Sequence, residues 1–192
     1  MSARRGAVPS RQAPSGGADG SSPVRIGVGS LVVEYSNTLR HPAWSPDGRR
    51  IALVSDRGYD GSLDVFVLAF EYANVTQLTD GFRQRGKVSY HQPAWSPDGG
   101  RIALVACPWW QYYDCVSSSV AIMKADGSGL TTLVDAGGFA RPTWSPDGRT
   151  IAFSRGSGSL FSSASGSVEW VRADGSERGV IVVNGHSPAW RP

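Results

Sequence analysis

Four residues that can bind a proton, a metal ion or an anion recur beside prolines. Each stands one or two residues before a proline that returns about every 50 residues. Imidazole and guanidinium groups gathered in this way could hold an anion, or, for the histidines, a metal ion. Equivalent positions on neighbouring repeats are usually too far apart to share one ion, so we interpret them as a polar rim and predict no metal site and no cofactor. The four residues are His41, His91, Arg141 and His186.

A second group of chemically notable residues fills the segment CPWWQYYDC, residues 107–115. Cys107 and Cys115 flank a loop and could form a disulfide if the strands on either side pair, which would suit an oxidising compartment; two free buried thiols are the alternative. The aromatic side chains between them are typical of surfaces that contact proteins or carbohydrates, although some could instead cover a neighbouring repeat. We expect a mixture of both roles. These residues are Trp109, Trp110, Tyr112 and Tyr113.

Sequence signatures of other functions are absent. There is no G-x-S-x-G nucleophile elbow, phosphate-binding G-x-x-x-x-G-K-[ST] loop or H-E-x-x-H pair. The net charge of +3 includes no stripe of Lys and Arg, which argues against nucleic-acid binding. No apolar run reaches the roughly 18–20 residues that span a bilayer, and the basic start lacks the hydrophobic region of a signal peptide. We therefore expect neither an enzyme nor a membrane-spanning protein.

The elements that position these residues are set by the repeated pentapeptide Trp-Ser-Pro-Asp-Gly. Proline presets φ at the second position of a turn, Asp tolerates the third and Gly suits the fourth. The Trp before the turn is an apolar anchor that can pack between neighbouring repeats. Turn geometry explains three aspartates in identical positions better than catalysis does. The structural residues are Trp44, Pro46, Asp47, Gly48, Trp95, Pro97, Asp98, Gly99, Trp144, Pro146, Asp147 and Gly148.

Each repeat predicts four short strands. The first ends at the repeat Trp, and the turn leads into an apolar second strand; Asp-Gly turns join the third and fourth strands of the later repeats. The predicted second strands are Arg50–Ser55, Arg101–Ala106 and Thr150–Ser154. The third strands are Leu63–Phe70, Val120–Lys124 and Val168–Arg172, and the fourth are Val75–Leu78, Leu130–Val134 and Val180–Val183.

The stretch PAWSPDGRRIALVSDR at 42–57, with NVTQLTDG at 74–81, resembles the WSPDG-type repeat (a WD40-like Pro-Asp repeat) of TolB-like β-propeller proteins. The same repeat type occurs in the propellers of prolyl-oligopeptidase-like serine peptidases. The resemblance implies an all-β fold, a partial or small β-propeller of about three to four four-stranded blades. In such a fold the first strand of each blade lines a central channel, so the histidines should gather near one mouth.

We expect residues 1–20 to form a disordered tail rich in Ser, Gly, Pro and Arg, and residues 21–192 to form the propeller repeats. TolB-like propellers resemble six-bladed rings, so the chain is expected to be an open arc, to pair as a homodimer that completes the ring, or to lack upstream blades. The ending AWRP replaces the turn residues, which places any missing part upstream. The expected units are strand material at 21–41, blades at 42–92, 93–141 and 142–187, and the first strand of a composite or missing blade at 188–192.

The resemblance implies a non-enzymatic protein-interaction scaffold of the cell envelope, periplasmic or secreted, with protein partners. The expected binding surface carries the loops between second and third strands together with the residues before the prolines. The alternative is a propeller enzyme or an enzyme accessory domain: a metal-dependent lyase-like protein, or the detached propeller of a prolyl-oligopeptidase-like serine peptidase.

Overall fold

A computed structural model describes residues 39–56, 62–70, 74–81, 88–108, 115, 117–138, 140–156 and 166–190. The tail expected at 1–20, and the strand material expected at 21–41 up to residue 38, lie outside these residues. So do the aromatic residues Trp109, Trp110, Tyr112 and Tyr113.

The described residues form β-strands and no helix, so the predicted all-β fold is confirmed. The strands make three four-stranded antiparallel sheets, each a meander in which neighbours in sequence pair. The first sheet holds β1 (Leu39–Trp44), β2 (Arg50–Ser55), β3 (Asp64–Ala69) and β4 (Asn74–Gln77). The second holds β5 (Val88–Trp95), β6 (Arg101–Pro108), β7 (Ser118–Lys124) and β8 (Thr131–Gly137). The third holds β9 (Thr143–Trp144), β10 (Thr150–Arg155), β11 (Ser167–Arg172) and β12 (Arg178–Val183).

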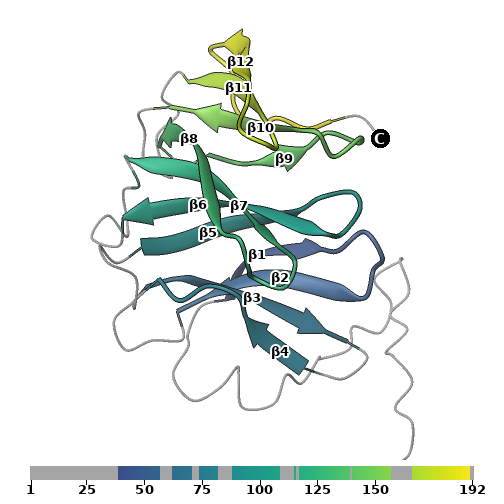
Figure 1. The fold of residues 1–192 in the computed structure, drawn as a ribbon. Helices are drawn as coiled ribbons and strands as arrows, with labels where there is room; N and C mark the ends of the chain where they lie inside the picture. The colour runs from purple at the N-terminus through teal and green to yellow at the C-terminus, as the bar shows by residue number, and fades with distance from the viewer. Residues whose placement is uncertain are drawn as a thin grey trace, which may run out of the picture.

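The three sheets stack face to face as consecutive blades of a partial propeller, from the first sheet at the bottom of Figure 1 to the third at the top. The first strands of neighbouring blades lie against one another, β1 on β5 and β5 on β9. The predicted second, third and fourth strands of each blade match the observed strands to within three residues at each end. Among the described residues, no helix is long and apolar enough to cross a bilayer.

The pentapeptide forms the predicted turn in all three blades. In the first, the N–H of Gly48 donates to the carbonyl of Ser45 at 2.9 Å, and Gly48 has φ +68°, a conformation that a side chain disfavours. The buried Ser45 hydroxyl donates to Asp47 Oδ1 at 2.5 Å and accepts from the N–H of Arg50 at 2.9 Å. The same bonds recur at Ser96 and Ser145. Serine and aspartate therefore serve the turn.

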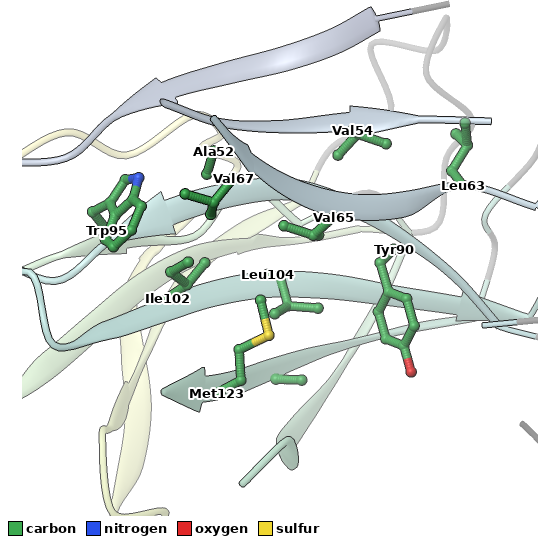
Figure 2. Packing of buried hydrophobic residues seen from close by; sticks show 11 residues of the cluster. Ala52, Val54, Leu63, Val65, Val67, Tyr90, Trp95, Ile102, Leu104 and Met123 are labelled. Atoms are coloured by element: carbon green, nitrogen blue, oxygen red, sulfur yellow. The ribbon is translucent and has the colours of Figure 1, made fainter. Parts of the chain in front are cut away.

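Strand alternation makes a core between each pair of blades. Along β6, Ile102 and Leu104 point to the first blade, whereas Ala103 and Val105 point to the third. Figure 2 shows Ile102 and Leu104 with Met123 facing Val65, Val67 and Ala52 of the first blade. Because both faces of the central blade are covered, its second and third strands are almost continuously apolar.

The repeat tryptophan links neighbouring blades through its indole N–H. Trp95 donates to the carbonyl of Ala43 in the preceding blade at 3.1 Å, and Trp144 donates to that of Ala94 at 3.0 Å. The same rings lie under arginines of the preceding blade: the guanidinium carbon of Arg50 is 4.5 Å from the Trp95 ring centroid, and that of Arg101 is 4.7 Å from the Trp144 ring centroid.

The C-terminal residues continue this pattern. Trp190 donates its indole N–H to the carbonyl of Thr143 at 3.2 Å, as the tryptophan of a following blade would. The predicted strand at 188–192 is not assigned to a strand in the described residues 188–190. Thr150 stands where the earlier blades have their arginine, and Trp190 remains 38% exposed, against 8% for Trp95.

Candidate functional site

Each predicted rim residue lies beside the proline that opens a repeat, and the backbone there is unusual. His41, Gln92 and Ser187, each directly before a proline, have φ of +52°, +50° and +54°. Proline disfavours the right-handed helical region for the residue before it, and the left-handed region costs roughly 1–2 kcal/mol for a residue with a side chain. In β1 and β5 the pairing register shifts at this point, as at a β-bulge, which re-aims the side chains.

The predicted residues come together across the blades. The His41 and His91 rings meet edge to face, with centroids 6.2 Å apart. Arg141 Nη1 donates to the Ser187 hydroxyl at 3.1 Å, and that hydroxyl lies 3.2 Å from Nδ1 of His186. We call this cluster the rim. It comprises Arg40, His41, His91, Gln92, Arg141, His186 and Ser187.

Two of the histidines are held neutral by their surroundings. Burial, with smaller effects from the His41 ring and the Arg40 charge, lowers the pKa of His91 from 6.5 to about 3. Burial also lowers the pKa of His41, and the charges of Arg40 and Arg141 lower it further. Arg141, on the third blade, therefore lies close enough to His41 on the first for its charge to act there.

The positive charge of the rim is not balanced by a carboxylate within the part of the chain that the structure describes. Arg40 and Arg141 form no ion pair with any described residue, whereas Arg50, Arg155 and Arg172 each do. Two buried rim atoms, Nδ1 of His41 and Oε1 of Gln92, have no hydrogen-bond partner in the structure. A buried polar atom without a partner costs roughly 1–3 kcal/mol, so the rim is polar beyond what folding requires.

Sequence reasoning missed Arg40, Gln92 and Ser187 as members of the rim. Gln92 and Ser187 occupy the same position, directly before a proline, that singled out His41 and Arg141. The position directly before a repeat proline is therefore the sequence signal that identifies Gln92 and Ser187. Arg40 becomes visible through its effect on both imidazoles.

The described residues contain no group of three or more His, Cys, Asp and Glu side chains that could hold a metal ion. The repeat aspartates are occupied within their turns. The serine hydroxyl and a backbone N–H lower the pKa of Asp47, Asp98 and Asp147, so they are ionised acceptors at neutral pH. A general acid needs a raised carboxyl pKa, so these aspartates do not suit that role.

The predicted disulfide is present. Cys107, at the end of β6, is bonded to Cys115, with their Cα atoms 5.9 Å apart. Cys107 pairs with Ser89 on β5, two residues from His91. Cys107 therefore lies at the same end of the second blade as His91 of the rim.

A hollow of about 480 Å³ lies between the second and third blades at their turn ends. Two of its three arginines already have partners: Arg101 donates to the Gly148 carbonyl at 2.8 Å, and Arg172 is 3.4 Å from Glu177. We therefore do not place the site there.

Comparison with known proteins identifies the repeat. The family described as TolB beta propeller domain matches residues 33–192. Among curated proteins, the uncharacterized peptidase YuxL of Bacillus subtilis is 28% identical over 59% of this chain, and the uncharacterized protein Atu1656 of Agrobacterium fabrum is 29% identical over 59%. The chain spans 21% and 39% of the lengths of these two relatives.

Solved structures share the fold at lower identity. A putative TolB from Agrobacterium tumefaciens aligns with a TM-score of 0.60 and 21% identity, covering 85% of this chain and 56% of that one. TolB from Acinetobacter baumannii aligns at 0.58 and 17% identity, covering 77% of this chain and 33% of that one. The chain forms three WSPDG blades and the family model matches most of its length, so the chain belongs to the TolB β-propeller family.

Proposed function

We propose that this chain is a non-enzymatic protein-interaction scaffold of the cell envelope that binds its partner through the rim end of the blades. The observation that carries the proposal is how the repeat uses its polar residues. The serines and aspartates of all three turns are occupied by hydrogen bonds within the turn, while the rim keeps unbalanced positive charge and two unpartnered buried atoms. Unsatisfied polar groups at one end of a rigid scaffold suit recognition.

The cysteines support the proposed compartment. The disulfide between Cys107 and Cys115 is the kind of bond that persists outside the reducing cytosol. It also joins the two ends of the segment that contains the four aromatic residues. Both properties suit a periplasmic or secreted binding protein.

Photo-crosslinking in cells that produce the chain tests the proposal. p-Benzoyl-phenylalanine is introduced in place of Leu39, which is 53% exposed and adjoins Arg40, and in a second variant in place of Ser128, which is exposed in a turn between β7 and β8. We expect one discrete crosslinked protein from position 39 and none from position 128. Equal crosslinking from both positions, or none from position 39, would contradict a binding surface at the rim.

The second candidate is an accessory propeller of a serine peptidase. It is favoured by the similarity to the peptidase YuxL, of which the chain covers 21%. A fluorophosphonate probe, which labels activated serines, is applied to the purified chain and to the protein that crosslinks at position 39. We expect neither to be labelled; labelling of the crosslinked partner that a serine-protease inhibitor prevents would favour the accessory role over the scaffold role.

A further inference from the structure

We propose that residues 25–30 of this chain, Arg-Ile-Gly-Val-Gly-Ser, dock on the open side of the first blade, with the guanidinium of Arg25 stacked on the ring of Trp44. The segment takes the place that the second strand of a preceding blade has in the rest of the repeat. Trp44 lies at the turn end of β1, so this contact is separate from the rim and does not rest on the proposed function.

The open side of the first blade carries residues that are buried against a preceding blade elsewhere in the repeat. Trp44 pairs with Ile51, and both point away from the second blade, because the next residue, Ala52, packs in the core shared with it. The equivalent pair in the second blade, Trp95 and Ile102, is at most 8% exposed and faces the first blade. Trp44, by contrast, is 59% exposed, and Ile51 is partly exposed.

One side of the Trp44 ring is occupied by its own blade. Phe70 stacks on it, with the ring centroids 5.1 Å apart and the planes at 24°. Phe70 stands where the second blade has Ala125, since each donates its N–H to the residue that follows the turn glycine. Phe66 and Leu68, further along the same face, are buried. The exposed surface is therefore centred on the other side of the Trp44 ring.

Elsewhere in the repeat, an arginine of the preceding blade covers the tryptophan ring. The guanidinium carbon of Arg50 lies 4.5 Å from the Trp95 centroid, and that of Arg101 lies 4.7 Å from the Trp144 centroid. Each arginine begins a second strand and is followed by isoleucine. The third blade lacks this arginine, and the tryptophan that follows it, Trp190, stays 38% exposed. The occupant of the first blade should therefore bring an arginine at the start of an extended apolar segment.

Residues 25–30 have this composition. The dipeptide Arg-Ile occurs three times in the sequence, at positions 25, 50 and 101, and the last two are the second-strand starts that cover a tryptophan. The segment RIGVGS shares three of its six residues with RIALVS at 50–55. In an extended segment Arg25, Gly27 and Gly29 fall on one side, and the two glycines let the backbone approach the tryptophan closely.

The chain is long enough to place this segment. Ser55 pairs with Leu39, and Cys107 with Ser89, so each second strand ends where a first strand begins. A second strand that ends at residue 30 on a preceding layer would therefore end near the start of β1. Residues 31–38 join the two points and can span roughly 26 Å, whereas packed sheets lie roughly 10 Å apart.

Hydroxyl-radical footprinting of the purified full chain tests the contact, because the oxidation rate of a tryptophan follows its exposure. The exposed fractions of 59% for Trp44 and 8% for Trp95 predict roughly sevenfold faster oxidation of an uncovered Trp44. We expect instead a Trp44 rate within about twofold of the Trp95 rate, because the docked state dominates. The protection should be the same at low and at high protein concentration, because the segment belongs to the same chain.

Two matched variants assign the protection. Arg25→Gln removes the stacking cation, and Arg11→Gln removes a charge that lies outside the segment. We expect R25Q to weaken docking roughly two- to fivefold and so to raise the Trp44 oxidation rate about twofold, and R11Q to leave that rate unchanged. The Trp95 rate should stay the same in both variants, which checks that the blades remain folded.

Three results would overturn the proposal: a Trp44 rate in the parent roughly seven times the Trp95 rate, protection of Trp44 that R25Q leaves intact, or protection that appears only at high protein concentration. The last would assign the open side of the first blade to a second copy of the chain instead. A partner crosslinked at position 39 while Trp44 is unprotected would refute this contact and leave the scaffold proposal standing. Protection of Trp44 without a crosslinked partner would do the reverse.

Discussion

His91 should make the stability of this protein depend on pH in a range where the aspartates do not titrate. The ring is buried beside His41 and Arg40, and its pKa in the folded protein is about 3, against 6.5 for an ordinary histidine. Since the unfolded chain binds the proton more readily, lowering the pH through 6.5 favours unfolding. The stability that neutral His91 contributes is complete above pH 6.5 and falls progressively as the pH drops toward 3.

The size of the effect follows from the two pKa values. One unit of difference corresponds to about 1.4 kcal/mol, so from about pH 7.5 to about pH 5 His91 should remove roughly 2 kcal/mol of unfolding free energy. His41, whose pKa is also lowered, acts in the same direction. For a domain of this size the loss corresponds to a melting temperature lower by roughly 4–8 °C.

Urea unfolding at the two pH values measures the difference directly. His91→Gln should abolish most of the pH dependence, whatever it does to stability at a single pH. A wild-type stability that is equal at both pH values, or a pH dependence in H91Q as large as that of the wild type, would refute the argument from burial.

Three further predictions concern the scaffold. In urea titrations, Trp144→Phe should lower the unfolding free energy by roughly 1–2 kcal/mol, because it removes the indole hydrogen bond to Ala94 and weakens the stacking of Arg101. The matched control Trp44→Phe, at a ring that is 59% exposed, should change the unfolding free energy by less than about 0.5 kcal/mol. Gly99→Ala should cost roughly 1–2 kcal/mol because φ is +67°, and the adjacent Gly100→Ala, where φ is not positive, should cost less; equal costs would contradict the turn assignment. Mass spectrometry without reductant should find the chain about 2 Da lighter than its reduced form, whereas a mass equal to that of the reduced form would show free thiols. Reduction of the disulfide should lower the unfolding free energy by roughly 2–3 kcal/mol.

The parts of the fold that depend on neighbours in sequence were predictable. The turn Ser45–Gly48 follows from local turn chemistry, and the strand β6 follows from the apolar run directly after such a turn. The disulfide was predictable because its cysteines flank one loop, although free thiols remained an alternative.

Only part of the rim could be predicted from the sequence, because its arrangement depends on contacts between strands and between blades. The bulges that turn His41 and Gln92 into the left-handed conformation depend on how β1 and β5 pair with their neighbours, which no local pattern encodes. The approach of Arg141 to His41 joins two blades that are not adjacent in sequence. The arginine stacked on Trp95 likewise comes from a blade about 50 residues earlier.

The central claim is that the repeat aspartates build turns while the rim binds the partner. The measurement that tests it compares partner affinity and urea midpoint in two variants, Asp147→Ala and Arg141→Gln, using the protein captured by crosslinking at position 39. We predict that D147A, which loses the bonds from Ser145 and Arg149, lowers the urea midpoint and leaves affinity unchanged. R141Q should leave the midpoint unchanged and weaken affinity roughly tenfold. Affinity that is lost in D147A at a pH and temperature where it remains folded, and kept in R141Q, would contradict the account.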